Sequence, residues 1–263
     1  MKITIAENAG FCFGVKRATD YVETLLSDAG GKVRIYTLGK LIHNRIYNDQ
    51  LHNRGVELAS NQDVEGIAAL SDTVGHTVMV IRTHGTSRAV DEKLRRLSEE
   101  HKNFEVVDLT CPYVKRIHKI ADENSGENVL FIIIGSSDHP EVEGIMSYVK
   151  GQCLVFTDSA ALEDYVSRES NPGRAVVMVA QTTQRLSEWK NCQRIIEKVY
   201  TNPFIFDTIC NITEKRQLEV EELSRNSDMM IVIGGRDSSN TKKLYELSKT
   251  NCENTQWIEN ADE

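Results

Sequence analysis

Three cysteines in similar surroundings are the residues of this sequence best placed to do chemistry. Cys12, Cys111 and Cys210 each stand where the chain turns into a segment of helical character, and each is followed by a Lys-Arg pair. The spacing is 99 residues from Cys12 to Cys111 and again from Cys111 to Cys210. Three equivalent turns that each carry a thiol indicate one shared site, built by three similar segments of the chain.

Iron–sulfur and zinc chemistry both fit three converging cysteines. A [4Fe–4S] cluster normally takes four cysteine ligands, so three would leave one iron without a protein ligand. Such an iron could bind a substrate oxygen as a Lewis acid while the cluster supplies electrons. Zinc would require a fourth ligand, and small buried thiols without a metal are the remaining interpretation. We expect that last role for Cys153, Cys192 and Cys252, which lie in none of the repeated turns.

The residues around the three turns are expected to favour the thiolate form. A helix N-terminus carries partial positive charge, and basic side chains nearby stabilise a thiolate further. The basic pairs are Lys16/Arg17, Lys115/Arg116 and Lys215/Arg216. Solvent-exposed helix faces are the alternative interpretation of these pairs.

A second group of polar residues follows predicted strands, at the edge where parallel sheets bind their ligands. Its members are His43, His84, His139, Ser238, Ser239 and Asn240. Imidazoles can donate hydrogen bonds to phosphate oxygens, and hydroxyls at a helix start suit an anion. The group therefore predicts a phosphorylated ligand, with ordinary helix capping as the alternative for Ser238–Asn240 alone. The glycine-rich motifs of common nucleotide sites are absent from the sequence.

A carboxylate and a threonine complete the candidate site. Glu141 stands two residues after His139, and burial beside a ligand would raise its pKa and suit it to proton donation. A favourable interaction with the helix dipole is its alternative role. Thr182 lies in Gln181-Thr182-Thr183 after another predicted strand, where its hydroxyl can form hydrogen bonds.

Strand and helix patterns alternate along the chain, which is typical of βαβ units with mostly parallel sheets. The predicted strands are Lys2–Ala6, Lys32–Thr37, Thr77–Arg82, Phe104–Leu109, Asn128–Ile134, Cys153–Phe156, Ala175–Ala180, Phe204–Asp207 and Met229–Ile233. The predicted helices are Gly14–Ser27 (ended by Gly30-Gly31), Ile42–Asn53, Ala89–Glu100, a helix from Pro112, Pro140–Val149, Ala160–Ser167, Leu186–Tyr200, Thr213–Ser224 and Asn240–Ser248.

The cysteine turns divide the chain into three α/β units. We expect units at residues 1–110, 111–209 and 210–263, with the N-terminal strand as a candidate to join the third, which is short. A net charge of −8 over 263 residues argues against nucleic acid or an anionic membrane as the main partner. The sequence has no continuous apolar run long enough for a transmembrane helix and no signal-peptide pattern at its start, so we expect a cytoplasmic protein.

The motifs taken together resemble one family, the 4-hydroxy-3-methylbut-2-enyl diphosphate reductases (IspH/LytB family). The matching segments are Ala9-Gly-Phe-Cys12-Phe-Gly-Val-Lys-Arg-Ala18, Ile42-His43-Asn44, Arg82-Thr-His84-Gly85, Asp108-Leu-Thr-Cys111-Pro112, Asp138-His139-Pro-Glu141-Val-Glu-Gly144, Gln181-Thr-Thr183, Asp207-Thr-Ile-Cys210 and Ser238-Ser-Asn240. They run in order over almost the whole chain, and the set is specific although single pieces are not.

The resemblance implies reductive dehydroxylation of the allylic diphosphate to isopentenyl and dimethylallyl diphosphate, the last step of the methylerythritol phosphate pathway. It implies a [4Fe–4S] cluster on Cys12, Cys111 and Cys210, with the substrate hydroxyl on the unique iron. It assigns Glu141 to proton supply, Thr182 to the substrate hydroxyl, and His43, His84, His139, Ser238, Ser239 and Asn240 to the diphosphate. A ferredoxin or flavodoxin would supply electrons, and three α/β units would surround a pseudo-threefold axis with the cluster at the centre.

The resemblance has one departure at its end. Family members continue beyond the equivalent of Glu263 and carry a further diphosphate-binding serine there. Either the sequence is a fragment of a longer product, or the third unit is incomplete. We expect the 263-residue form to be unstable or inactive, because a missing strand and helix would expose the core of the third unit.

Two other classes of function compete with the reductase. A non-catalytic α/β binding module for a phosphorylated metabolite would have structural or zinc-bound cysteines. An NAD(P)-dependent enzyme lacks its glycine fingerprint in this sequence.

Overall fold

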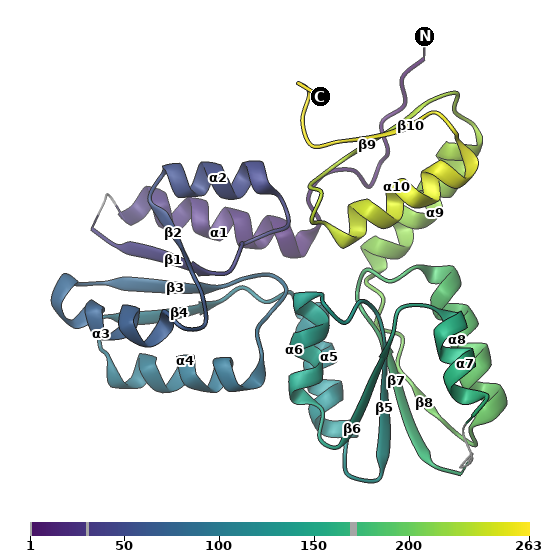
Figure 1. The fold of residues 1–263 in the computed structure, drawn as a ribbon. Coiled ribbons are helices and arrows are strands. Elements are labelled where there is room, and N and C mark those ends of the chain that lie inside the picture. Colours follow the sequence, from purple (N-terminus) through teal and green to yellow (C-terminus); the bar gives the residue numbers. More distant parts are fainter. Residues whose placement is uncertain (1, 30–31, 169–172) are drawn as a thin grey trace.

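The computed structural model describes residues 2–29, 32–168 and 173–263, and within these ranges the strands form three parallel sheets. Figure 1 shows that the three sheets and their helices surround a common centre. The alternation of strands and helices confirms the predicted α/β class.

The first sheet has helices on both faces. Its strands are β1 (Arg34–Leu38), β2 (Val56–Ala59), β3 (Thr77–Ile81) and β4 (Phe104–Asp108), in the order β2-β1-β3-β4. Its helices are α1 (Phe13–Ala29), α2 (Arg45–Asn53), α3 (Val64–Val74) and α4 (Arg88–Glu100). One core packs α1 and α2 against the sheet, and a second packs α3 and α4 against the other face.

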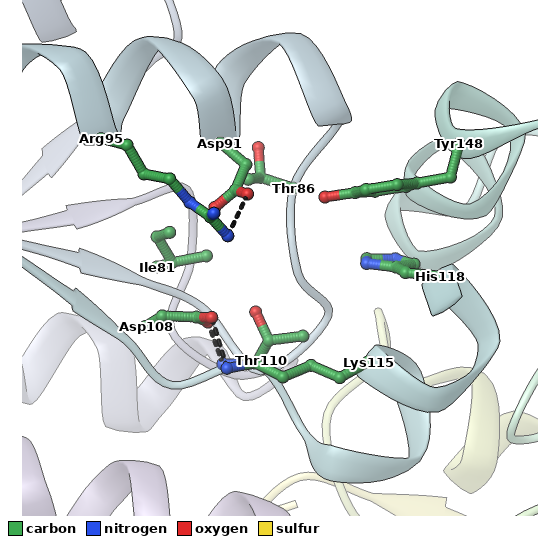
Figure 2. A pocket seen from close by; sticks show the side chains of 9 residues that line it. All are labelled: Ile81, Thr86, Asp91, Arg95, Asp108, Thr110, Lys115, His118 and Tyr148. Carbon is green, nitrogen blue, oxygen red and sulfur yellow. Dashed lines mark hydrogen bonds and ion pairs between the residues drawn. The ribbon is translucent and has the colours of Figure 1, made fainter. Parts of the chain in front are cut away.

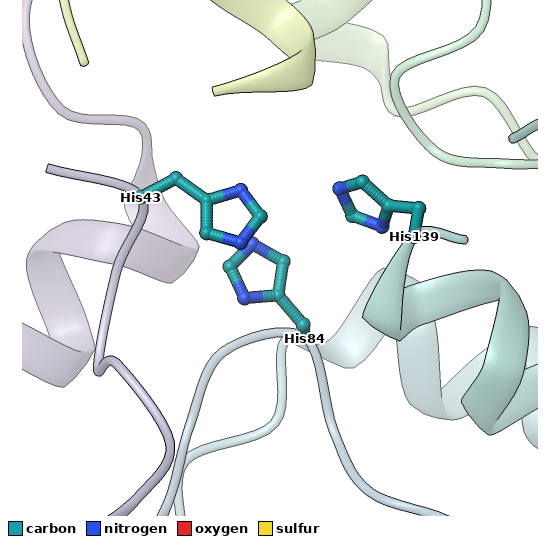
Figure 3. Close-up of side chains that lie close together, drawn as sticks. All are labelled: His43, His84 and His139. Atoms are coloured by element: carbon teal, nitrogen blue, oxygen red, sulfur yellow. The ribbon is translucent and has the colours of Figure 1, made fainter. Parts of the chain in front are cut away.

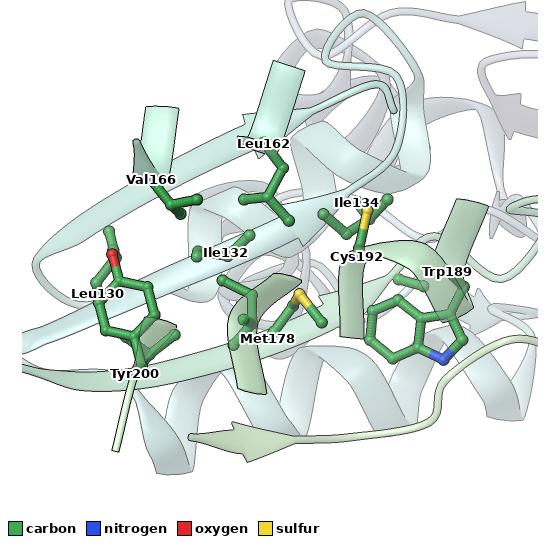
Figure 4. Packing of buried hydrophobic residues seen from close by; sticks show 12 residues of the cluster. Leu130, Ile132, Ile134, Leu162, Val166, Met178, Trp189, Cys192 and Tyr200 are labelled. Atoms are coloured by element: carbon green, nitrogen blue, oxygen red, sulfur yellow. The ribbon is translucent and has the colours of Figure 1, made fainter. Parts of the chain in front are cut away.

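The second sheet repeats this connectivity. Its strands are β5 (Val129–Ile134), β6 (Gln152–Phe156), β7 (Ala175–Ala180) and β8 (Phe204–Ile205), in the order β6-β5-β7-β8. Its helices are α5 (Pro112–Asn124), α6 (Pro140–Tyr148), α7 (Ser159–Val166) and α8 (Leu186–Val199). Figure 4 shows the core under α7 and α8, where Leu162 and Trp189 pack over Ile132 and Met178. The continuous apolar runs of β5 and β7 fit strands that are covered on both faces.

The third sheet has two strands within the described residues. These are β9 (Met230–Ile233) and β10 (Thr255–Ile258), which pair in parallel, and the accompanying helices are α9 (Asn211–Arg225) and α10 (Ser239–Asn251). Ile231 and Ile233 of β9 are 52% and 68% exposed. This sheet is therefore less covered than the other two.

The strand predicted at Lys2–Ala6 is wrong. The structure shows no regular secondary structure there, and Ile3 and Ile5 are largely exposed. Apolar and polar residues do alternate in this segment, as they do in a strand. A strand also requires hydrogen bonds to a neighbouring strand, and the described residues provide no such neighbour. The segment that follows, from Glu7 to Gly10, instead contacts α9 of the third unit through Glu219 and Arg216.

Three elements were not predicted: the strands β2 and β10 and the 11-residue helix α3. Strands β2 and β10 have only four residues each, and β2 exposes both of its central side chains, so its pattern lacks the alternation of a half-buried strand. The other predicted elements are present with boundary shifts of a few residues. Gly30-Gly31, expected to end the first helix, lie outside the described residues.

No helix in residues 2–29, 32–168 or 173–263 is both long and apolar enough to cross a lipid bilayer.

The core under α7 gives a direct test of this packing. Leu162 is fully buried on α7, whereas Leu70 on α3 is 43% exposed. We predict that Leu162→Ala lowers the free energy of unfolding by about 2–5 kcal/mol, because it leaves a cavity between helix and sheet. The matched Leu70→Ala should change it by about 0.5 kcal/mol or less. Urea denaturation followed by circular dichroism measures both, and equal effects would contradict the burial of Leu162.

Candidate functional site

The three predicted cysteines occupy the same position at the start of three helices. Cys111 and Cys210 are the N-cap residues of α5 and α9, and Cys12 directly precedes α1. Their carbonyl oxygens each accept the first helical hydrogen bond, from the N–H groups of Lys16, Lys115 and Glu214. The predicted turn into a helix is therefore present at all three, although no strand precedes Cys12.

The cysteines also lie close to one another. A Cβ atom placed on Gly14 would lie 2.8 Å from Cys111 Sγ, so Cys111 packs against the first turn of α1 beside Cys12. The charge of a Cys12 thiolate raises the pKa of both Cys111 and Cys210, which places the three thiols within electrostatic reach. Three half-buried, free thiols at one place form the soft donor set that an iron–sulfur cluster requires.

The expectation that these surroundings favour thiolates is wrong for Cys111 and Cys210 in the chain without a metal. Burial raises the pKa of Cys111 and Cys210 above that of an ordinary thiol. The N–H groups of Tyr113 and Val114 lower the pKa of Cys111, but less than burial raises it. Removal of water thus outweighs the helix N-terminus, and a bound metal ion would supply the missing positive charge.

Two arginines of the basic pairs hold the main chain in front of the cysteines. Arg17 donates to the carbonyl oxygens of Leu109 and Thr110 at 2.9 and 2.8 Å, directly before Cys111. Arg216 donates to the carbonyl oxygens of Asn8 and Gly10, shortly before Cys12. Arg17 of α1 therefore fixes the main chain that leads into the Cys111 turn, and Arg216 of α9 fixes the segment that precedes Cys12.

Backbone hydrogen bonds join two of the cysteine turns to neighbouring strand ends. The N–H of Cys111 donates to the carbonyl oxygen of Thr83 at 3.0 Å, and the N–H of Cys210 donates to that of Thr182 at 3.0 Å. These two bonds are 99 residues apart at both ends, as the cysteine spacing predicts. Because Thr83 precedes His84, the main chain links the cysteines to the second group of candidate residues.

The three predicted histidines come together from two units (Figure 3). The rings of His43 and His84 stack with centroids 4.0 Å apart, and His139 meets them edge-on at 5.3 and 5.6 Å. Their ligand nitrogens all lie within 4.8 Å of one another, a spacing that suits either a divalent metal ion or an anion bridging the rings.

Burial keeps these imidazoles neutral near pH 7. It lowers the pKa of His43 and His139 to about 4, and it lowers that of His84 well below its ordinary value. His139 Nδ1 accepts a 3.1 Å hydrogen bond from the N–H of Glu141, so the proton of neutral His139 is on Nε2. His139 therefore caps α6 through one nitrogen and has the other available as a donor.

The start of α10 lies beside this histidine cluster. A Cβ atom on Gly235 would be 2.3 Å from the carbonyl oxygen of His43, so the loop between β9 and α10 packs directly on that residue. Ser238 caps α10 by accepting from the N–H of Thr241 at 3.2 Å, as the capping alternative predicts. Ser239 accepts from the hydroxyl of Thr183 at 3.0 Å, which ties α10 to the second unit.

Glu141 and Thr182 form a buried pair. One carboxylate oxygen of Glu141 accepts from the Thr182 N–H at 2.6 Å, and the other accepts from the Thr182 hydroxyl at 2.7 Å. Both residues are less than a tenth exposed. Burial raises the pKa of Glu141, and the two hydrogen bonds from Thr182 oppose this in part. The raised pKa expected from the sequence is therefore present and arises from burial.

Two cations near the site were not assigned a role from the sequence. Arg82 precedes the His84 loop, and its charge lowers the pKa of all three histidines. Lys243 of α10 acts in the same way on His139. Arg82 opens the matching segment Arg82-Thr-His84-Gly85, and Lys243 lies three residues after Asn240, so these positions were the signals that could have indicated them.

A separate cavity of about 150 Å³ lies between α4, α5 and α6 (Figure 2). It contains two ion pairs, Arg95–Asp91 at 2.9 Å and Lys115–Asp108 at 2.5 Å, and a stack of His118 on Tyr148. Its charged groups are thus paired with one another. The cavity lies beside Thr110, and we assign no ligand to it.

Comparison with known proteins places the chain in a family. Residues 3–263 match the family described as LytB protein. The 4-hydroxy-3-methylbut-2-enyl diphosphate reductase of Thermoanaerobacter sp. (strain X514) is 37% identical over 263 residues, which is 100% of this chain and 85% of that protein.

Solved structures agree with this match. A structure of (E)-4-hydroxy-3-methyl-but-2-enyl diphosphate reductase, the terminal enzyme of the non-mevalonate pathway, is 34% identical with a TM-score of 0.65, covering 99% of this chain and 86% of that one. The E-1-hydroxy-2-methyl-but-2-enyl-4-diphosphate reductase from Plasmodium falciparum shares the fold, with a TM-score of 0.79 at 24% identity over 97% of this chain and 75% of that one. The chain therefore belongs to the LytB family.

Proposed function

We propose that this chain reduces 4-hydroxy-3-methylbut-2-enyl diphosphate to isopentenyl and dimethylallyl diphosphate, the last step of the methylerythritol phosphate pathway. The observation that carries the proposal is the convergence of three helix-capping cysteines, three neutral histidines and the buried Glu141–Thr182 pair on connected loops. The names of the relatives supply the substrate. The non-catalytic binding module has no support from these relatives.

An iron–sulfur cluster follows from membership of the LytB family. We propose that it is a [4Fe–4S] cluster held by Cys12, Cys111 and Cys210. When bound, it supplies electrons and a Lewis-acidic iron at the substrate hydroxyl. The half-buried thiols and the arginine-held turns in front of two of them support a preformed site.

The histidine cluster and the start of α10 are proposed to hold the diphosphate. The residues are His43, His84, His139, Ser238, Ser239 and Asn240. Neutral imidazoles donate hydrogen bonds through N–H, and the first turn of a helix presents unpaired N–H groups to an anion. Hydroxyl and N–H donors at α10 favour an anion over a metal ion, which needs acceptors.

Proton supply is proposed to run from Glu141 through Thr182. The reaction adds two electrons and two protons and releases the substrate hydroxyl as water. When Glu141 is ionised, the Thr182 hydroxyl donates to it. When Glu141 is protonated, this bond reverses, and Thr182 can donate to the leaving hydroxyl oxygen. The raised pKa of Glu141 makes the protonated form accessible.

The remaining parts of the proposal are the electron donor, the boundaries of the three units and the location of the protein. The two electrons would come from a ferredoxin or flavodoxin, and the largely exposed Phe11 and Phe13 beside Cys12 offer apolar surface for such a donor. The unit boundaries at residues 1–110, 111–209 and 210–263 agree with the three sheets. A cytoplasmic location stays a prediction.

Cysteine substitution tests the cluster. We predict about four iron and four sulfide per chain in anaerobically purified protein. Cys111→Ser should lose most of both, together with the brown colour, because it removes one of three ligands. Cys153→Ala, at a half-buried cysteine of β6 outside the site, should retain them. Iron and sulfide analysis measures both variants, and a fully loaded Cys111→Ser protein would contradict the assignment.

Glu141→Gln tests the proton path. The variant keeps the size of the side chain but cannot donate an acidic proton, so turnover should fall by about 100-fold or more while substrate still binds. Glu143→Gln, on the exposed side of the same helix, is the matched control and should keep normal turnover. Steady-state kinetics with a chemical reductant separate kcat from KM. Full activity in Glu141→Gln would remove this residue from the mechanism.

The neutral histidines predict a pH dependence of stability. The pKa of His43 is about 4 in the folded chain, against an ordinary value of 6.5. Between these values the unfolded chain binds more protons, so the free energy of unfolding falls as the pH is lowered from 6.5 to 4. Thermal unfolding of cluster-free protein should show this fall, and His43→Gln should make it shallower. An unchanged slope would show that His43 is not a buried neutral group.

A further inference from the structure

The six residues proposed to hold the diphosphate offer hydrogen-bond donors but little positive charge of their own. The three histidines among them are neutral near pH 7 because burial lowers their pKa values. A diphosphate carries several negative charges, and its transfer from water into a buried site is unfavourable without cations. The charge must therefore come from side chains around the histidines.

Lys243 lies on the face of α10 that packs against the second unit. Ser239, Lys243 and Glu246 are spaced four and three residues apart, so they share one side of the helix. Ser239 accepts a hydrogen bond from Thr183, and Glu246 forms an ion pair with Arg185. Lys243 is thus held between two contacts with the loop that follows β7, next to Thr182.

The ammonium group of Lys243 is buried and lacks a partner. Its Nζ atom is shielded from solvent and makes no hydrogen bond with any described residue. Burial lowers the pKa of Lys243 to about 8, so the group is still mostly protonated near pH 7. A buried ammonium without a partner destabilises the chain, which indicates that an anion from outside completes it.

Two groups of the proposed site lie within electrostatic reach of this ammonium. The charge of Lys243 adds to burial in lowering the pKa of His139, which belongs to the histidine cluster, and it offsets part of the rise that burial causes in the pKa of Glu141. No ion pair joins Lys243 to Glu141 among the described residues, and both carboxylate oxygens of Glu141 already accept from Thr182. Glu141 therefore leaves the three donors of the ammonium available to a ligand.

We propose that Lys243 is a further substrate-binding residue, whose buried ammonium pairs with a phosphate oxygen of the diphosphate ligand beside His139. The inference rests on the proposed function for the identity of the ligand. Its physical basis is the buried ammonium group of Lys243, which has no hydrogen-bond partner among the described residues and lies on α10 within electrostatic reach of His139. A charge-assisted hydrogen bond at this position contributes more than the neutral bonds that the imidazoles donate.

Titration of the cluster-loaded protein with inorganic diphosphate tests the proposal. Lys243→Met removes the charge at similar length, Lys243→Arg keeps it, and Lys242→Met removes the charge of the exposed neighbour. We expect Lys243→Met to raise the Kd for diphosphate about tenfold or more, as the loss of a buried charged contact does. Lys243→Arg should restore most of the affinity, and Lys242→Met should match the wild type. The melting temperature of ligand-free Lys243→Met should equal or exceed that of the wild type, because an unpaired buried charge is gone.

Two results would overturn the proposal. One is an unchanged Kd in Lys243→Met. The other is a raised Kd together with a lower melting temperature and no recovery in Lys243→Arg, which would show that the lysine supports only the fold. Turnover of the allylic diphosphate by the wild-type protein is measured in parallel. If turnover is absent but diphosphate binding depends on Lys243, the proposed function fails and the anion-binding role of Lys243 stands.

Discussion

The backbone hydrogen bonds from Cys111 to Thr83 and from Cys210 to Thr182 determine how the rest of the site is arranged. Each bond fixes a cysteine turn against the end of a neighbouring parallel strand. One of these strand ends continues into His84, and the other contains Thr182, which holds Glu141. The main chain therefore sets the positions of the cysteines relative to the anion-binding and proton-transfer groups. Because main-chain bonds depend little on side-chain identity, the same bond recurs 99 residues later in a unit of different sequence.

Burial is the second constraint, and it acts on most titratable groups of the site. It lowers the pKa of the histidines, raises that of Glu141, and raises those of Cys111 and Cys210. Without its ligands, the site therefore has few charged side chains, and Arg82 and Lys243 are the cations that act on His139. The charges of a cluster and of a diphosphate then interact with few competing groups, so a buried cation such as Lys243 has a large effect on the binding of the diphosphate.

The sequence predicted the repeated βαβ pattern and the candidate cysteines, histidines, Glu141 and Thr182, but it assigned no role to Arg82 or Lys243. The predicted residues could be found because they stand next to segments with clear sequence patterns. Glu141 and Thr182 come after the continuous apolar strands β5 and β7, and the cysteines stand at the starts of helices. The errors have a physical cause in tertiary structure. Lys2–Ala6 alternates like a strand but has no backbone partner within the described residues, and β2 is an edge strand with exposed central residues.

The roles of the basic residues could not be predicted in the same way. Arg17 and Arg216 appeared as helix-surface or thiolate-stabilising groups, but they bind carbonyl groups of residues at least 92 positions away in the sequence. Lys243 resembles its exposed neighbour Lys242 in sequence, and only the packing of α10 against the loop after β7 distinguishes them. Contacts between units depend on how three separate sheets are placed, which local patterns do not encode.

We propose that the three units supply one cysteine each to a single iron site beside the histidine cluster. Anomalous X-ray diffraction at the iron absorption edge, on crystals of anaerobically loaded protein, tests it most directly. We predict one compact peak of iron scattering in contact with the Sγ atoms of Cys12, Cys111 and Cys210, and none among His43, His84 and His139. Iron located at the histidines, or held by Cys153, Cys192 or Cys252, would contradict it.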